Sequence, residues 1–325
     1  MRTAFFQALM AAAEEDETIH LVVGDLGFGV VEPFAKKFPN RFLNSGVAEQ
    51  NMTGIAAGLA LMGKTVFTYS IANFPTLRCL EQIRNDVCYH NLPVKIVALG
   101  GGFAYGGLGM THHATEDLAL LRAMPGMTVV APGEPIEAFH ATRAVVSHPG
   151  PCYLRIGRAG EPVIHERGIQ FKIGKALLLR DGTDVTLIST GGLLQVATQA
   201  ADLLARRGVE TRVLSMPTLK PLDEGAILSA SRETCAILTI EEHSVIGGLG
   251  SAVAEVLAES SGTRVPFRRI GLPSEFSLVA GSQDYLRGAH GLTAEELAGA
   301  AMNLFSAVRS GRVPRAAITT QCAKT

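Results

Sequence analysis

The sequence predicts an α/β protein built from two domains. Its 325 residues are about twice the length of a typical domain of roughly 150 residues. Apolar residues make up 47% of the chain and charged residues 18%, which is ample for two cores and too apolar for a disordered chain. Short apolar runs alternate with helical patterns along most of the sequence. This alternation predicts parallel sheets with helices on both faces.

The first half of the chain predicts one such sheet. Strands are expected at residues 19–23, 65–69, 94–99, 127–131 and 152–156. Helices are expected at residues 47–62, 76–90 and 134–147. The first helix is rich in Gly and Ala, which would let it pack closely against the sheet. The second helix is expected to bury one face, formed by Leu77, Leu80, Ile83 and Val87.

A change in composition at residues 158–172 predicts a linker, because Gly160, Pro162 and Gly168 stand there among scattered charges without a clear period. A second α/β series follows. Its strands are expected at 185–189, 211–216, 235–241 and 265–270, and its helices at 194–207, 248–260 and from the N-cap Thr293. We therefore expect a first domain at residues 1–160, a linker at 161–172, a smaller second domain at 173–310 and a loose tail at 311–325.

Composition and charge exclude several classes of protein. The formal net charge is −1, so no basic surplus is available to hold a nucleic acid. No run of about 18 apolar residues predicts a membrane span, and the early acidic run at residues 14–17 argues against a signal peptide. The five cysteines are scattered and form no CxxC pair, which argues against a disulfide framework and a structural zinc site. We expect a cytoplasmic protein.

Two motifs could carry chemistry, and each has an ordinary structural alternative. The pair His112 and His113 follows a glycine-rich loop and precedes two carboxylates, so it could be half of a metal site or a loop with one buried, hydrogen-bonded histidine. Glu49 stands at the start of an apolar helix, where a carboxylate also favours the positive end of the helix dipole. The glycines at 100–102 fit a phosphate-binding motif only loosely, and a plain loop is an equal alternative.

Longer motifs resemble thiamine-diphosphate enzymes of the transketolase and deoxyxylulose-phosphate synthase branch. The resemblance covers about residues 1–310. It is carried by Val47–Asn51 with Ala56–Ala60, Gly107–His113 with Glu116, Asp117, Leu121 and Arg122, Tyr153–Arg158, Glu241–His243 and Gly247–Gly250. It implies a parallel-sheet pyrimidine-binding domain followed by a smaller α/β transketolase C-terminal domain, which is used mainly for assembly.

The resemblance implies roles for residues of the first domain. Glu49 matches the family carboxyl group that hydrogen-bonds N1′ of the cofactor's pyrimidine and so activates C2 of the thiazolium. A carboxyl in an apolar pocket suits this task, because desolvation raises its pKa and keeps a proton available. Phe74 is expected to form the aromatic platform for the pyrimidine, with Tyr69 as the alternative.

The resemblance also implies substrate-binding residues. His112 matches a histidine that faces the substrate carbonyl and hydroxyl beside the thiazolium. Arg158 matches an arginine that holds a substrate phosphate, and Arg2 resembles another phosphate-binding arginine. Leu108 stands where transketolases have an Asp that contacts a substrate hydroxyl. A preference for 2-hydroxyaldehydes therefore does not follow. A phosphate-binding histidine of transketolases falls near Gly100–Gly102 in this chain, so the acceptor could be unphosphorylated or less polar than a sugar phosphate.

The largest departure from the family concerns the metal. The family binds the diphosphate through a divalent cation held by a GDG motif and a later Asn, and this chain has no GDG. Gly24-Asp25-Leu26 with Asn51 imitates only the spacing. We expect no metal ligand here, and a separate diphosphate-binding subunit that holds Mg²⁺ or Ca²⁺ in an α2β2 heterotetramer.

The resemblance predicts a subunit that transfers a two-carbon ketol unit from a ketose donor to an aldehyde acceptor, active only with its partner. Two alternatives remain open. One is the β subunit of a 2-oxoacid dehydrogenase, a family to which the loop at 111–117 fits less well. The other is a non-catalytic assembly subunit, against which a buried carboxylate at Glu49 argues, because burying an idle charge costs free energy.

Overall fold

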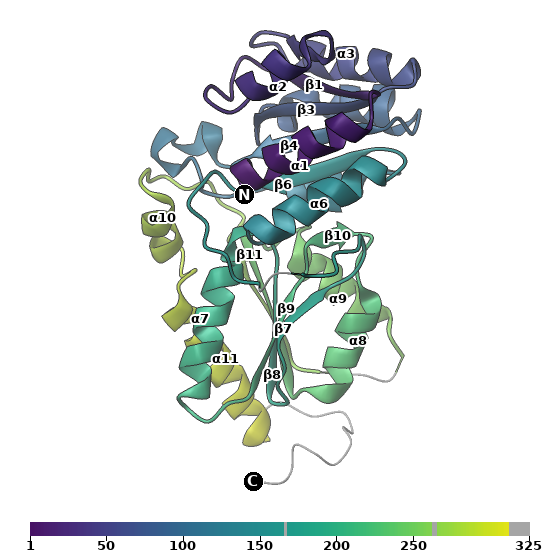
Figure 1. Ribbon diagram of the computed structural model, residues 1–325. Coiled ribbons are helices and arrows are strands. Elements are labelled where there is room, and N and C mark those ends of the chain that lie inside the picture. Colours follow the sequence, from purple (N-terminus) through teal and green to yellow (C-terminus); the bar gives the residue numbers. More distant parts are fainter. Residues whose placement is uncertain (166–167, 262–264, 312–325) are drawn as a thin grey trace.

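The computed structural model describes residues 1–165, 168–261 and 265–311. These residues form two β-sheets, each with helices on both of its faces (Figure 1). The first sheet has seven strands in the order β10-β5-β6-β4-β3-β1-β2. They are β1 (Ile19–Val23), β2 (Phe42–Asn44), β3 (Thr65–Ile71), β4 (Val94–Leu99), β5 (Thr128–Val130), β6 (Cys152–Ile156) and β10 (Thr218–Lys220). All are parallel except β10, which pairs antiparallel with β5.

Helices cover both faces of this sheet. They are α1 (Arg2–Glu15), α2 (Glu32–Lys37), α3 (Glu49–Leu61), α4 (Leu80–Gln82), α5 (Asp117–Ala123) and α6 (Pro135–Ser147). Figure 1 shows α1 and α6 side by side along one face. Phe5 and Leu9 of α1 share a buried cluster with Phe67, whereas Met52 and Ala56 of α3 belong to the cluster on the other face. Burial on both faces explains why the central strands read as continuous apolar runs.

The second sheet has five strands in the order β12-β11-β8-β9-β7, with β7 antiparallel to β9. Its strands are β7 (Leu177–Arg180), β8 (Val185–Ser189), β9 (Thr211–Ser215), β11 (Ala236–Ser244) and β12 (Phe267–Leu272). Its helices are α7 (Leu194–Ala205), α8 (Glu224–Glu233), α9 (Leu249–Glu259), α10 (Gln283–Ala289) and α11 (Ala294–Arg309). In Figure 1, α7 and α11 lie on one side of this sheet and α8 and α9 on the other. The predicted α/β fold class is confirmed.

The helix expected at 76–90 is irregular. It consists of the 3-10 turn η2 (Leu77–Cys79), α4, and the π-helical η3 (Ile83–Cys88). The prediction of a buried apolar face is therefore only partly right. Ile83 and Val87 are fully buried, but Leu77 is 42% exposed. The change of helical period turns Leu77 away from the core. π-helical turns are frequent at functional sites.

Several expectations from sequence have clear structural outcomes. Thr293 caps α11 by accepting a hydrogen bond from the backbone N–H of Glu296, as expected. The described part of residues 158–172 contains no helix or strand, and residues 166–167 of the expected linker lie outside the described residues. Almost all of the expected tail, residues 312–325, also lies outside them. Within the described residues, no helix is both long and apolar enough to cross a membrane.

Candidate functional site

Most of the candidate residues lie where parallel strands of the first sheet end. Glu49 begins α3, Phe74 follows β3, His112 lies on the long loop after β4, and Arg158 follows β6. Ligand sites of open α/β sheets form at the carboxyl ends of the strands, because the loops that follow neighbouring strands converge there. The topology therefore brings together residues up to 109 positions apart in the sequence, from Glu49 to Arg158.

Glu49 is a buried carboxylate with one cationic partner. Its side chain is only 1% exposed, and its Oε2 accepts a hydrogen bond of 2.6 Å from Nη1 of Arg78. Among the described residues, no hydrogen bond reaches its Oε1. Oε1 lies beside the end of β1, where a Cβ added at Gly24 would lie 3.6 Å from it and 3.5 Å from Oγ of Ser70. The carboxylate therefore keeps one unused acceptor, Oε1, next to a residue without a side chain, Gly24.

Phe74 links Glu49 to His112. The Arg78 guanidinium that pairs with Glu49 also lies 5.0 Å from the centroid of the Phe74 ring. The His112 ring meets Phe74 edge to face, with 5.2 Å between the ring centroids and 75° between the planes. The predicted platform Phe74 and the predicted substrate residue His112 are therefore in direct contact. Arg78 was not predicted from the sequence, although it stands only four residues after Phe74.

Tyr105 joins His112 to the two predicted phosphate-binding arginines. Its ring centroid is 6.5 Å from that of His112, and the Arg158 guanidinium lies 5.1 Å from its ring. Burial raises the pKa of Tyr105, while the positive charges of Arg158 and Arg2 act in the opposite direction. Arg2 and Arg158 therefore both lie near the Tyr105 hydroxyl. Nε of Arg2 is buried without a hydrogen-bond partner.

Tyr69, the alternative platform, has different ring contacts from Phe74. Its ring is fully buried and stacks on Phe5 of α1, with centroids 6.0 Å apart, and it contacts Phe6 edge to face. Burial raises the pKa of Tyr69 well above its ordinary value. β3 directs this side chain into the α1 cluster, on the opposite face of the sheet from α3. The structure therefore brings Phe74, and not Tyr69, into contact with Arg78 and His112, and Phe74 remains our predicted platform.

The two histidines of the glycine-rich loop have different surroundings. His113 is 4% exposed, and its Nε2 lies 3.3 Å from the carbonyl oxygen of Gly106. It fits the alternative of a buried, hydrogen-bonded histidine. His112 is partly exposed, and its ring forms a hydrogen bond with Thr111, with 3.0 Å between Nδ1 and Oγ1. No cluster of three or more potential metal ligands occurs among the described residues.

Cavities flank this series of contacts. One of about 330 Å³ is bordered by Phe74, Arg78 and Thr111 and by Phe276 and His290 of the second half of the chain. An open cavity of about 550 Å³ borders Tyr105, Leu108 and Arg158 on the other side. The site therefore combines a buried carboxylate, an aromatic ring, a histidine and an exposed guanidinium. This set can hold a planar ring, position a carbonyl group and bind an anion.

Comparison with known proteins identifies the family. Residues 1–160 match the transketolase pyrimidine-binding domain, and residues 174–297 match the transketolase C-terminal domain. The chain therefore belongs to the transketolase family and carries these two of its domains.

The similar proteins include subunits of transketolases. The chain is 42% identical over 296 residues to one subunit of the apulose-4-phosphate transketolase of Phocaeicola vulgatus, covering 90% of this chain and 94% of that protein. It is 40% identical over 302 residues to the 6-deoxy-6-sulfo-D-fructose transketolase subunit SqwH of Clostridium sp. strain MSTE9, covering 93% of each. A solved structure described as "Split gene transketolase, inactive beta4 tetramer" is 38% identical, with a TM-score of 0.87 over 94% of this chain and 98% of that one.

Proposed function

We propose that this chain is one subunit of a split, thiamine-diphosphate-dependent transketolase that moves a two-carbon ketol unit from a ketose to an aldehyde. The observation that carries the proposal is the unbroken series of contacts from buried Glu49 through Arg78, Phe74 and His112 to Tyr105. Relatives named as transketolase subunits support the class of reaction. The identities of the donor and acceptor sugars differ between those relatives, so the proposal does not include them.

The residues present fit the pyrimidine end of the cofactor. Oε1 of Glu49 is an unused acceptor in a buried position, and the side chain of Ser70 near it has a buried, unpartnered hydroxyl. Phe74 offers an aromatic ring that meets the His112 ring edge to face. When bound, thiamine diphosphate supplies the nucleophilic carbon that attacks the substrate carbonyl. Glu49 would hold the proton at the pyrimidine nitrogen, and Phe74 would fix the plane of the ring.

Arg78 holds one side of the Glu49 carboxylate. Its Nη1 donates a hydrogen bond of 2.6 Å to Oε2 of Glu49. The guanidinium is 48% exposed, so it can remain hydrated while its partner is buried. We infer that Arg78 keeps Glu49 oriented toward the ligand. His112 would donate to the oxygen of the reacting carbonyl, and Arg158 would bind a phosphate at the outer end of the substrate.

The diphosphate end of the cofactor lacks a counterpart in the described residues. No group of three carboxylate, histidine or cysteine ligands is present there. Asp25, which imitates the metal motif in sequence, exchanges hydrogen bonds with Asn44 instead of Asn51. We therefore propose that a second, diphosphate-binding subunit supplies Mg²⁺ or Ca²⁺ and that two copies of each chain form an α2β2 assembly.

An exposed face of α3 supports this arrangement. A Cβ added at Gly54 or Gly58 would meet no other atom within 4 Å, and Leu61 and Met62 at the end of the helix are 65% and 80% exposed. Val47, just before Glu49, is 74% exposed. Large exposed apolar side chains around a polar site are typical of surfaces that another protein covers. The partner would thus close over the helix that carries Glu49.

The split assembly predicts weak cofactor binding by this chain alone. We expect titration calorimetry with thiamine diphosphate and Mg²⁺ to show little heat for the isolated chain, because the described residues form no cluster of three or more potential metal ligands. Adding the diphosphate-binding subunit from the same organism should restore both binding and ketol transfer. Tight, magnesium-dependent binding and turnover without any partner would contradict the proposal. Oxoacid decarboxylation by the reconstituted pair would favour the 2-oxoacid dehydrogenase alternative.

The substrate roles of Arg158 and His112 predict different kinetic effects. Arg158→Ala should reduce kcat/KM for phosphorylated sugars and leave that for the matching free sugars unchanged, because in the proposed role the guanidinium would bind only the phosphate group of the substrate. His112→Ala should reduce kcat on both substrate classes by roughly 10²-fold or more, because it acts at the reacting carbonyl. Paired kinetics of the reconstituted enzyme measure both effects. Equal losses for Arg158→Ala on both substrate classes would exclude its phosphate role.

A further inference from the structure

The loop that carries His112 is closed at its base by a pair of backbone hydrogen bonds. Gly102 and Ala114 form an antiparallel bridge, with N–H to O distances of 2.8 Å from Gly102 to Ala114 and 2.9 Å in the reverse direction. The residues between them include the short helical turns η4 (Gly106–Leu108) and η5 (Met110–His112). The position of this bridge therefore sets the position of His112 and Tyr105.

A carboxylate from the second half of the chain lies directly on this base. Glu242 of β11 is 2% exposed, and its Oε1 accepts a hydrogen bond of 2.8 Å from the backbone N–H of Phe103. A Cβ added at Gly102 would lie 2.6 Å from Cδ of Glu242, so a side chain at this position cannot fit without displacement. Gly102 also has a φ of +64°, which favours glycine. Contact between Glu242 and the loop is thus direct and close.

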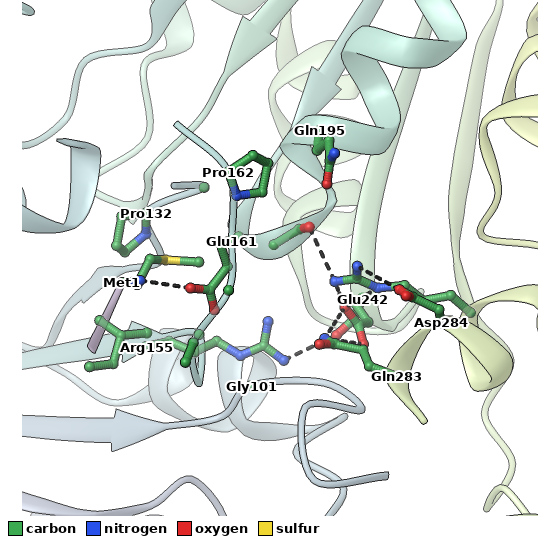
Figure 2. A pocket seen from close by; sticks show the side chains of 18 residues that line it. Met1, Gly101, Pro132, Arg155, Glu161, Pro162, Gln195, Glu242, Gln283 and Asp284 are labelled. Carbon is green, nitrogen blue, oxygen red and sulfur yellow. Dashed lines mark hydrogen bonds and ion pairs between the residues drawn. The ribbon is translucent and has the colours of Figure 1, made fainter. Parts of the chain in front are cut away.

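The Glu242 carboxylate is itself held in one orientation. Oε2 accepts hydrogen bonds from Nε and Nη2 of Arg287, at 2.9 and 2.6 Å, and Nε2 of Gln283 lies 3.0 Å from both carboxylate oxygens. Nη2 of Arg287 also donates to the carbonyl oxygen of Gly192. Figure 2 shows Glu242 and Gln283 joined in this network at one side of an interdomain pocket. Because Arg287 holds Oε2 through two donors while Phe103 and Gln283 hold Oε1, rotation of the carboxylate is restricted.

Arg155 completes the attachment from the first domain. Its Nη2 donates to the carbonyl oxygens of both Ala114, at 2.7 Å, and Glu242, at 3.0 Å. Its Nε lies 2.9 Å from Oδ2 of Asp117, and the side chain is 5% exposed. Figure 2 shows Arg155 facing the same pocket as Glu242. Both residues of the loop's closing bridge are therefore in contact with the Arg155–Glu242 pair.

We propose that Glu242, a residue of the C-terminal domain, positions His112 for the reaction by fixing the base of its loop. This inference rests on the proposed function for the catalytic effect, but the effect on the loop is independent of it. Catalytic groups need placement to within about half an ångström, and a displacement of about 1 Å can cost roughly 100-fold in rate. The C-terminal domain would thus contribute to catalysis without contacting the substrate.

Glu242→Ala tests this role in the reconstituted enzyme. We expect kcat to fall about 10- to 100-fold with little change in the dissociation constant for thiamine diphosphate. Amide hydrogen exchange in residues 103–114 should become faster, which is a readout that needs no activity. Glu242→Gln keeps an acceptor for the Phe103 N–H and should restore much of kcat. Gly102→Ala should also lower kcat, because it pushes the loop and Glu242 apart and strains the left-handed backbone at residue 102.

The matched control is Glu255→Ala. Glu255 on α9 pairs with Arg122 on α5, so it also bridges the two halves of the chain, but it does not touch the loop. It should leave kcat and the exchange of residues 103–114 unchanged. Wild-type kcat and exchange in folded Glu242→Ala or Gly102→Ala would overturn the inference. If the wild-type assembly does not transfer ketol units, the proposed function is refuted. Faster exchange of residues 103–114 in Glu242→Ala would then still support the positioning of the loop by Glu242.

Discussion

Replacing Glu49 with Gln is expected to lower ketol transfer by roughly 10²- to 10⁴-fold, the usual contribution of a positioned acid–base group. Glutamine has nearly the same shape, so it can fill the buried site at the start of α3, but it cannot exchange a proton with the cofactor. Arg78 loses its charged partner, yet half of its side chain is exposed and remains hydrated. We therefore expect the fold and assembly to survive. Turnover by the reconstituted pair at saturating cofactor measures the effect.

The control for this prediction is Glu81→Gln. Glu81 is an exposed glutamate on α4, three residues after Arg78, and it has no role in the proposed site. Its replacement should leave turnover unchanged. Near wild-type activity of Glu49→Gln would remove Glu49 from the catalytic site and would favour the non-catalytic assembly subunit.

Arg155→Met is expected to lower the free energy of unfolding by about 3–5 kcal/mol, because it leaves a buried carboxylate unpaired. The Asp117 side chain is fully buried, and Oδ2 receives both the Arg155 ion pair and a hydrogen bond from the Tyr153 hydroxyl, at 2.5 Å. The hydroxyl alone cannot offset the charge. Burial and the negative charge of Asp117 raise the pKa of Tyr153 well above its ordinary value, so this hydroxyl remains protonated. Urea unfolding of the purified chain measures the loss.

Two variants test whether the loss comes from the unpaired charge. Arg143→Met breaks a surface pair with Glu15, whose side chains are 37% and 63% exposed, and should cost less than about 1 kcal/mol. Adding Asp117→Leu to Arg155→Met removes the orphaned carboxylate and should recover part of the stability. Equal unfolding midpoints for Arg155→Met and Arg143→Met would show that the buried ion pair contributes no more to the free energy of unfolding than the surface pair does.

The sequence predicted the central strands well because their signal is local. The runs at 19–23, 94–99, 152–156 and 185–189 agree to the residue with β1, β4, β6 and β8. Each consists largely of apolar residues buried on both faces, and its ends coincide with polar or turn residues. Elements without such a signal were missed. α1 has no side-chain cap at its N-terminus, and β7 and β10 are short edge strands whose pairing depends on distant residues.

The candidate site was predicted in part. Phe74 and His112 were assigned from sequence, and the structure brings them into contact, while Arg158 and Arg2 both lie near Tyr105. Arg78 and Tyr105, which connect these residues, were not predicted, because an arginine in a helix and a tyrosine in a glycine-rich loop have many ordinary roles. Spacing alone also could not separate Tyr69 from Phe74, because the face of a strand toward which a ring points depends on register. The roles of all these residues remain predictions.

The strand β10 has a consequence for how the polypeptide folds as it is made. Residues 218–220 complete the first sheet by pairing with β5 at residues 128–130, although they come after three strands of the second sheet. A ribosome must therefore synthesise about 90 further residues after β5 before that edge can be covered. Until then the nascent chain presents an open strand edge, the kind of surface that pairs with other chains. Proteolysis at residues 158–172 would likewise not release two independently folding pieces.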